Sequence, residues 1–222
     1  MKRNKSMRRE FTDNELYEEQ HRFKERRSNA RFFVIVVACI LLLLGFRWWW
    51  TSTFGGVVID GSSMNPTLYH GEKLLMKYTD EESEAKRGDV IVVYVGDYEE
   101  CRTVSSGFLI KRLIAIEGDV VKCIDGQVYI MYAGTDEYVA LDEPYAYYRT
   151  EETKANYDFG PYEVGEGEIF FLGDNRNNSI DSRYGLKDGS HLEGKLYKAS
   201  DIYGIVPTWA IEKQKTLEKI FF

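Results

Sequence analysis

Residues 120–131 read VVKCIDGQVYIM, and this stretch decides the fold. Two short segments rich in Val, Ile and Tyr flank Asp125-Gly126, and an Asp-Gly pair in this setting is a strong signal for a two-residue β-hairpin. Long amphipathic helical patterns are nearly absent after residue 50, so the sequence predicts a mainly antiparallel β domain. Further runs of strand length lie between turn residues, at 56–59, 73–77, 89–95, 109–116, 168–172 and 202–206.

An apolar segment precedes the predicted strands. It runs without interruption from Phe32 to Phe46, and Arg47 with three tryptophans extends it to Trp50. At about 1.5 Å per helical residue, residues 32–50 cover roughly 28 Å, close to the hydrocarbon thickness of about 30 Å. Residues 51–54 contain no Ala-x-Ala cleavage site. We therefore expect a retained transmembrane helix rather than a cleaved signal peptide.

Charge is distributed unevenly along the chain. Residues 1–31 hold ten Lys/Arg and six Asp/Glu, whereas residues 32–222 hold nineteen and thirty. Basic residues directly before the apolar segment, and none from 48 to 72, predict a cytoplasmic N-terminus and an extracytoplasmic main domain. The acidic main domain argues against a nucleic-acid partner, because phosphate binding needs clustered positive charge.

These observations divide the chain into three parts. Residues 1–31 are predicted to be a charged cytoplasmic tail or short exposed helix, residues 32–50 the transmembrane helix, and residues 51–222 the extracytoplasmic β-rich domain. Within that domain, residues 132–165 are rich in Tyr, Glu and Gly without a sustained apolar run, so we expect an inserted lobe or long loops there.

Three polar motifs interrupt the apolar pattern. Residues 61–68 read GSSMNPTL, residues 109–114 read LIKRLI, and residues 173–183 read GDNRNNSIDSR. The three histidines, His21, His70 and His191, lie outside any recognisable motif, so a serine nucleophile would need another base. Taken alone, each motif has a structural explanation: a turn serine, a strand lysine that snorkels to solvent, or a hydrogen-bonded loop.

Together and in this order, the motifs and the apolar anchor resemble the bacterial type I signal peptidase family over roughly residues 30–206. These membrane-anchored serine proteases remove signal peptides with a Ser/Lys dyad. The resemblance implies an antiparallel β-sheet catalytic domain of signal-peptidase/LexA-like type, with no metal and no organic cofactor. It also implies a nucleophile at Ser63, a general base at Lys111, a hydroxyl that orients the lysine at Ser179, and bracing charges at Asp174, Arg112, Asp181 and Arg183.

One position departs from part of the family. Some members carry a side-chain hydroxyl two residues before the nucleophile to complete the oxyanion hole, and this chain has Gly61 there. Backbone amides, including that of Ser63, would then have to stabilise the oxyanion. The adjacent Ser62 is expected to have no direct role.

The proposed base also follows from physical chemistry. A lysine in water has a pKa of about 10.4, but burial disfavours its charged form and can lower the pKa by about 3–5 units. The apolar neighbours Ile110, Leu113 and Ile114 provide such burial for Lys111. A nearby carboxylate would favour the charged form, so we expect Asp174 and Asp181 to pair with arginines.

The resemblance implies shallow S1 and S3 pockets that select Ala-like side chains, and Ile59, Met64, Phe108 and Ile110 are the residues expected to line them. An extended substrate could add a strand beside the edges that carry Ile59 and Ile110. The expected partners are secretory preproteins and membrane lipid. Phe54, Val57 and Val58 could equally lie against lipid or in the core. Nothing in the sequence argues for more than a monomer.

Two alternatives and one covalent question stay open. A serine/lysine autocleaving regulator of the LexA type would lack the membrane anchor, and a membrane-tethered peptide- or cell-wall-binding β-domain would not need Ser63, Lys111 and Ser179 together. Cys39 lies in the apolar segment, while Cys101 and Cys123 lie in the main domain. Their positions permit a disulfide but do not require one, and we expect them to be unpaired.

Overall fold

The computed structural model describes residues 13–79, 85–98, 101, 104–155, 157–183 and 197–221. Residues 1–12 of the predicted tail and His191 lie outside the described residues. The chain divides into two compact units, Met1–Thr51 and Ser52–Phe222.

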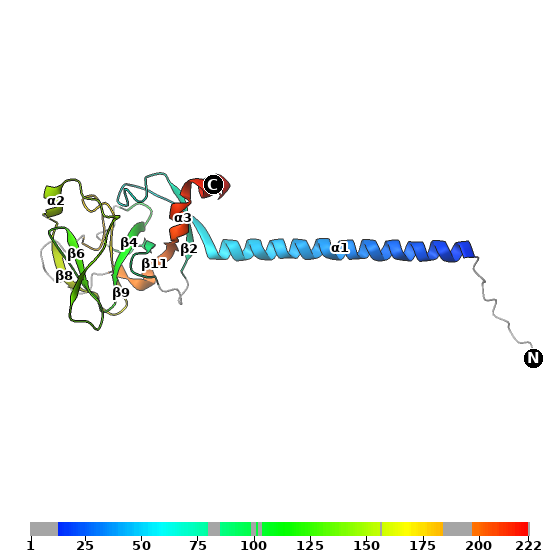
Figure 1. The fold of residues 1–222 in the computed structure, drawn as a ribbon, viewed down its shortest axis with the longest axis horizontal. Coiled ribbons are helices and arrows are strands. Elements are labelled where there is room, and N and C mark those ends of the chain that lie inside the picture. Colours follow the sequence, from blue (N-terminus) through cyan, green and yellow to red (C-terminus); the bar gives the residue numbers. More distant parts are fainter. Residues whose placement is uncertain are drawn as a thin grey trace, which may run out of the picture. The chain divides into compact units, whose positions relative to one another are not determined.

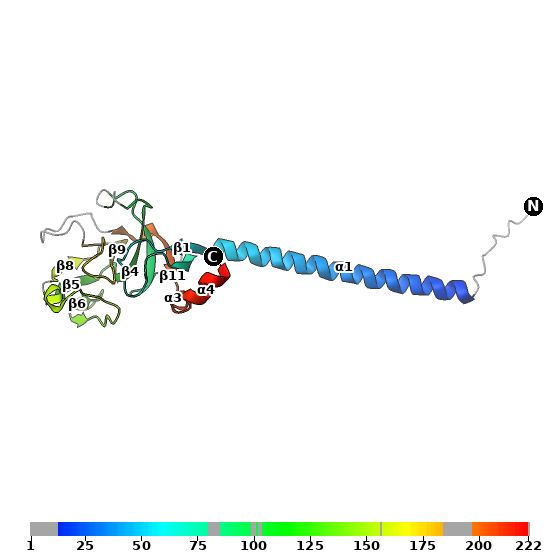
Figure 2. The same cartoon turned by 90° about the horizontal axis from the view of Figure 1, so that it is seen from above.

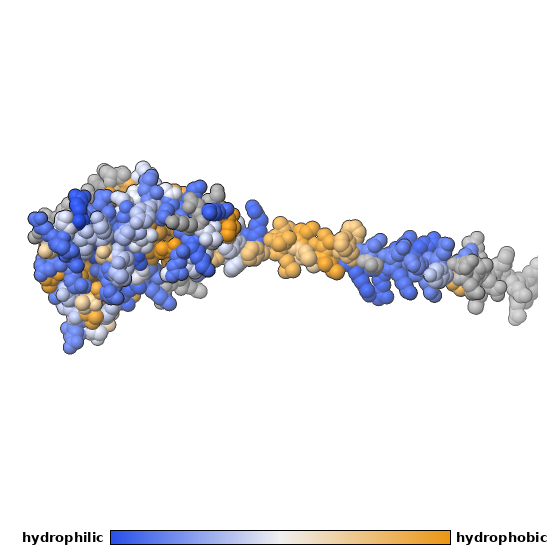
Figure 3. All heavy atoms as spheres, turned by 45° about the horizontal axis from the view of Figure 1, so that its top comes forward, coloured by the Kyte–Doolittle hydropathy of each residue, from blue (hydrophilic) through white to orange (hydrophobic). Residues whose placement is uncertain are grey.

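Helix α1, Asp13–Thr53, is continuous from the described part of the predicted tail to the start of the β unit (Figure 1). Its apolar side chains are exposed, with Phe32 at 65% and Leu42 at 73%. Figure 3 shows an apolar band on the helix and a hydrophilic section on its N-terminal side. Over Glu15–Thr53 the helix is long and apolar enough to cross a membrane, and no other helix among the described residues is.

The predicted antiparallel β fold is confirmed by a sheet with the strand order β1-β2-β11-β3-β4-β9-β10. Neighbouring strands in it pair antiparallel throughout. Its strands are β1 Phe54–Val58, β2 Lys73–Tyr78, β3 Val90–Tyr94, β4 Phe108–Ile116, β9 Glu168–Leu172, β10 Tyr197–Lys198 and β11 Ile202–Val206.

A smaller sheet has the order β7-β6-β5-β8. Its strands are β5 Val120–Ile124, β6 Gln127–Met131, β7 Tyr138–Ala140 and β8 Phe159–Glu163. The predicted hairpin joins β5 to β6, with φ of 50° at Asp125 and 73° at Gly126. Positive φ at both turn residues is the type I′ signature that an Asp-Gly pair favours.

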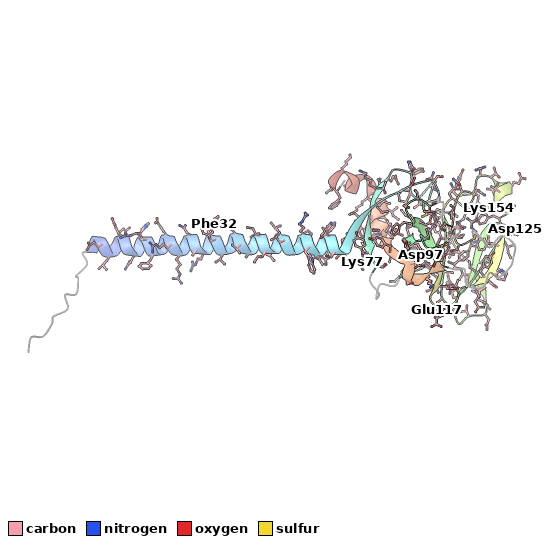
Figure 4. The ribbon with its side chains drawn as sticks, turned by 180° about the vertical axis from the view of Figure 1, so that it is seen from behind. Phe32, Lys77, Asp97, Glu117, Asp125 and Lys154 are labelled. Atoms are coloured by element: carbon pink, nitrogen blue, oxygen red, sulfur yellow. The ribbon has the colours of Figure 1, made fainter. Side chains whose placement is uncertain are left out.

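The predicted lobe, residues 132–165, supplies β7, β8 and helix α2, Glu151–Ala155. Lys154 of α2 lies close to the hairpin turn at Asp125 (Figure 4). A Cβ added to Gly126 would stand 2.4 Å from Cγ of Lys154, so glycine permits this close approach. The lobe is therefore packed into the small sheet rather than being only loops.

Short helices follow the last strand of the large sheet. They are η2 Ala199–Asp201, α3 Thr208–Glu212 and α4 Gln214–Phe221. Helices α3 and α4 pack beside β2, at the opposite end of the β unit from the small sheet (Figures 1 and 2).

Strand β4 connects the two hydrophobic cores. Leu109 and Leu113 belong to a cluster with β3 and β9 residues, whereas Ile114 and Ala115 belong to a cluster with β5 and β6 residues. A register shift between Leu113 and Ala115 accompanies this change. Because side chains alternate along a strand, Lys111 points to the same side as Leu109 and Leu113, into the protein interior.

Candidate active site

Ser63, in the loop after β1, meets Lys111, which lies within strand β4. Nζ of Lys111 lies 2.7 Å from Oγ of Ser63 and donates a 2.8 Å hydrogen bond to the carbonyl of Ile110. Lys111 is 2% exposed. Burial lowers the pKa of Lys111 from 10.5 to about 8, while the negative charges of Asp181 and Asp174 oppose the shift without reversing it. The amine can therefore be uncharged near neutral pH.

The loop between β1 and β2 holds Ser63 in a tight turn. Gly61 has a φ of +89°, a conformation that a residue with a side chain rarely adopts. The amide of Asn65 donates to the carbonyl of Ser62 at 3.1 Å, and the amide of Leu68 donates to the carbonyl of Met64 at 3.0 Å. Met64 and Leu68 are each 1% exposed, so buried side chains anchor the loop on both sides of the turn.

The 173–183 loop binds the Ser63 turn directly. The amide N–H of Asn175 donates to the carbonyl of Ser63 at 3.0 Å, and its side-chain amide donates to the carbonyl of Ser62 at 3.1 Å. The side chain of Asn178 donates to the Ser62 hydroxyl at 2.8 Å. The sequence predicts a polar loop here but no role for either asparagine, because these tertiary hydrogen bonds leave no local sequence pattern.

Gly173 allows the two loops to approach. A Cβ added at this position would stand 2.6 Å from the carbonyl oxygen of Ser63 and 2.2 Å from Oγ of Ser179. Both distances are too short for ordinary contact, and one of the atoms belongs to the backbone. Glycine is required here by close packing against the turn that carries Ser63.

Both predicted bracing pairs are present in the structure. Arg112 donates to the two carboxylate oxygens of Asp174 at 2.9 and 2.7 Å, and Arg183 donates to those of Asp181 at 2.8 and 2.7 Å. Both carboxylates are fully buried. Asp174 also accepts a 2.5 Å hydrogen bond from the Thr67 hydroxyl. Each acid is thus neutralised by an arginine, as the charge argument for Lys111 predicts.

The resemblance also implies roles for the Ser179 hydroxyl and for backbone amides beside the nucleophile. Oγ of Ser179 is buried and has no hydrogen-bond partner within the described residues, so no hydrogen bond to the Lys111 amine is formed. The N–H of Gly61 donates to Nδ1 of His70 at 3.1 Å, which engages that amide. The amide of Ser63 makes no hydrogen bond in the described part of the chain and remains open for an oxyanion.

A cleft of about 1330 Å³ contains the site. The expected pocket residues Ile59, Met64, Phe108 and Ile110 all line it, together with Ser63, Lys111 and Ser179. Strand β1 pairs only with β2, and β4 pairs with β9 only from Arg112 onward. Among the described residues, β1 and the first part of β4 therefore have edges that an added strand could pair with.

None of the three cysteines, Cys39, Cys101 and Cys123, forms a disulfide bond, as expected. Sγ of Cys123 donates to the carbonyl of Tyr157 at 3.0 Å, and Sγ of Cys101 lies 3.1 Å from the hydroxyl of Tyr197. The two thiols belong to different hydrophobic clusters.

The fold and the site define a class: an antiparallel β unit that places a serine hydroxyl on a buried lysine amine, as a serine hydrolase with a lysine base requires. The family model described as signal peptidase, peptidase S26, matches residues 28–208. The chain belongs to this family of serine peptidases.

The chain is similar to several named signal peptidases. Signal peptidase I of Bacillus licheniformis is 37% identical over 139 residues, covering 60% of this chain and 68% of the relative. Signal peptidase I S of Bacillus subtilis (strain 168) is 36% identical over 135 residues, with the same two coverages. A crystal structure of a signal peptidase I from Enterococcus faecalis, 26% identical, covers 56% of this chain and 98% of its own, with a TM-score of 0.39.

Proposed function

We propose that this chain is a signal peptidase I in which Ser63 is the nucleophile and Lys111 is the general base. The observation that carries the proposal is the 2.7 Å approach of the buried amine to the serine hydroxyl. The relatives named above act as signal peptidases, which supports the same reaction here.

The proposed reaction begins with an uncharged Lys111. Its amine accepts the hydroxyl proton of Ser63 while Oγ bonds to the scissile carbonyl carbon, and the resulting oxyanion accepts a hydrogen bond from the Ser63 amide. Lys111 then donates the proton to the leaving amine, and an ester to Ser63 forms. A water molecule attacks this ester with Lys111 again as the base, which releases the signal peptide and restores the hydroxyl.

The supporting residues keep that amine uncharged and in place. Arg112 and Arg183 neutralise Asp174 and Asp181, which otherwise would favour the protonated lysine. The buried hydroxyl of Ser179 lines the same cleft, and we assign to it the role of orienting the amine when substrate is bound. No metal or organic cofactor is needed for these steps.

We propose that the substrate lies as an extended strand along the edges of β1 and β4. The side chains of Ile59, Met64, Phe108 and Ile110 all line the cleft, and we assign to them the shallow pockets for alanine-like residues at P1 and P3. Secretory preproteins with an Ala-x-Ala segment are the corresponding substrates, and main-chain pairing would hold the scissile bond over Ser63.

We propose the topology that the sequence predicts, with residues 1–31 in the cytoplasm, residues 32–50 across the bilayer, and residues 51–222 outside as a monomer. Ser63 follows Trp50 by thirteen residues. At about 3.6 Å per extended residue, the nucleophile lies within roughly 47 Å of the end of the anchor. The site would therefore meet preproteins as they emerge at the outer face of the lipid bilayer.

Cleavage of a precursor by the full chain in proteoliposomes tests the proposal. We expect a precursor with an Ala-x-Ala site to be cut, and Ser63→Ala or Lys111→Ala to abolish cleavage. Lys77→Ala, at an exposed position of β2, is the matched control for loss of a lysine. Full activity in Lys111→Ala would remove the proposed base, and binding without cleavage by the unaltered chain would favour a tethered peptide-binding domain.

A further inference from the structure

A segment of the inserted lobe runs beside the 173–183 loop. This segment, residues 143–149, is called the strap. The amide of Tyr147 donates to the carbonyl of Asp174 at 2.8 Å, and the amide of Arg176 donates to the carbonyl of Tyr147 at 3.0 Å. The amide of Arg149 donates to Oδ1 of Asn177 at 2.6 Å. Three hydrogen bonds thus fix the strap to Asp174, Arg176 and Asn177 of the loop.

A buried ion pair reinforces the strap. Nη1 of Arg176 donates to Oε2 of Glu143 at 3.1 Å, and Nη2 donates to the other carboxylate oxygen. The side chains are 0% and 6% exposed. Arg176 also donates to the hydroxyl of Tyr148 at 3.3 Å and, through Nε, to the carbonyl of Gly173 at 3.2 Å. A guanidinium held in this way fixes the backbone of the loop, because moving the loop would leave a buried charge without its partner.

The strap also touches the bracing charges. Cζ of Arg112 lies 3.9 Å from the ring centroid of Tyr145, within cation–π distance. Arg112 is the partner of Asp174, and Asp174 accepts from Thr67 on the Ser63 loop. The strap therefore contacts the loop by its backbone, by an ion pair and through Arg112.

The same loop binds the nucleophile turn on its other side. Asn175 lies between Asp174 and Arg176, which the strap holds, and it binds the carbonyls of both Ser62 and Ser63. We propose that Glu143 is a positioning residue for Ser63, acting through Arg176 and Asn175. This inference rests on the proposed peptidase function and gives the inserted lobe a role in it. A displacement near 1 Å at a nucleophile can cost about 100-fold in rate.

The test compares Glu143→Gln with Asp119→Asn in the full chain. The carboxylate of Asp119 is fully buried and paired with Arg87, and it also accepts hydrogen bonds from the amides of Ile116 and Ala133. It is thus a buried carboxylate paired with an arginine, here a partly exposed one, that does not touch the 173–178 segment. We expect Glu143→Gln to lower kcat by about 10- to 100-fold with little change in KM. Asp119→Asn should change kcat less than about threefold once rates are normalised to folded protein.

A double-mutant cycle tests the route. Glu143 acts through Arg176 and Asn175. The factor by which the double variant Glu143→Gln/Asn175→Ala lowers kcat should therefore be smaller than the product of the two single-variant factors. Multiplicative losses, or an unchanged kcat in Glu143→Gln, would overturn the proposal. Should Glu143→Gln fail to fold, Asn177→Ala removes one strap contact from an exposed residue and should still lower kcat.

Amide hydrogen exchange provides a readout that does not depend on cleavage. We expect the amides of residues 61–68 to exchange faster in Glu143→Gln than in the unaltered chain, and to be unchanged in Asp119→Asn. Faster exchange in a chain that cuts no precursor would reject the peptidase function while supporting the strap. Cleavage with unchanged exchange and unchanged kcat in Glu143→Gln would do the reverse.

Discussion

Lys111 and Arg112 are neighbours on β4, yet their surroundings differ completely. Lys111 is buried against Ser63 and the carbonyl of Ile110, and no carboxylate of the described residues lies within salt-bridge distance of it. Arg112 points to the other face of the strand, where it binds Asp174 through two hydrogen bonds. The same strand thus removes two cations from water in two different ways.

The difference teaches what burial does to a basic group. Without a counter-charge, desolvation favours the neutral form, and it lowers the pKa of Lys111 to about 8. With a paired carboxylate, a buried cation keeps its charge and holds two segments together. Arg176 and Arg183 follow the second pattern, each with a buried carboxylate partner. Among these cations, only Lys111 is prepared to accept a proton.

The largest expected effect comes from breaking the ion pair between Arg112 and Asp174. Asp174→Asn leaves the Arg112 guanidinium without its counter-charge while preserving side-chain volume. Removing one partner of a buried pair costs about 3–5 kcal/mol, so we expect a loss of that size in the free energy of unfolding. Urea unfolding followed by tryptophan fluorescence measures it. Glu163→Gln, on the solvent side of β8, is the control and should change stability by less than about 0.5 kcal/mol. An equally small effect of Asp174→Asn would contradict the view that the pair holds the loops.

Burial of Lys111 without an ion-pair partner predicts that the free energy of unfolding depends on pH. Lys111 has a folded pKa of about 8 and an unfolded value of 10.5, so the unfolded chain binds more protons between these pH values. Stability contributed by the neutral amine therefore increases as pH rises through that window, by about 3 kcal/mol at most. Below pH 8 both states are protonated and the full penalty of burying the charge applies.

Lys111→Met isolates this contribution because buried tyrosines also titrate in the alkaline range. We expect the variant to be more stable than the unaltered chain at pH 7 and to lose that advantage progressively between pH 8 and 10.5. Free energies of unfolding at a series of pH values give the difference. A constant difference across the window would show that burial does not shift the amine.

Activity should depend on the same proton and should also increase with pH. Only the neutral amine can act as base, so kcat/KM should rise tenfold per pH unit below about 8 and level off above it. At pH 7 the rate should be roughly one tenth of the plateau. Initial rates on a precursor between pH 6 and 9.5 check this, with Ser179→Ala as a comparison that alters orientation but not charge. A profile that is flat down to pH 6 would contradict a lysine base.

Much of the fold could be predicted because its signals are local. Strands β5, β6, β9 and β11 have the predicted bounds, and the Asp125-Gly126 hairpin forms as expected. Strand β8 was missed because Gly160-Pro161 lies inside it, and both residues weaken a strand pattern. Strands β7 and β10 are too short to show alternation. The helical part of the charged segment extends much further than predicted, as one helix with the apolar span.

The site could be predicted only in part, for a related reason. The meeting of Ser63 and Lys111 follows from the resemblance and from an apolar strand around one lysine. The pair Glu143 and Arg176 gives no sequence pattern because the partners are 33 residues apart and belong to different elements. Asn175 and Asn178 likewise act through tertiary hydrogen bonds that no local spacing encodes. The unpartnered hydroxyl of Ser179 is also a property of packing rather than of the motif.

The smallest expected effect extends the comparison from buried basic groups to a buried acidic group, the thiol of Cys123. Cys123 is buried, and desolvation raises the pKa of its thiol to about 12 although the positive charge of Arg176 opposes the shift, so the neutral form is again favoured. Because the thiolate is the reactive species, we expect iodoacetamide at pH 8 to leave Cys123 unmodified in the folded chain and cleavage activity unchanged. Mass spectrometry of tryptic peptides, with and without prior unfolding in urea, measures the modification. Alkylation of Cys123 at the rate of the unfolded chain would mean that this core opens readily, and the same desolvation argument would then fail for Lys111.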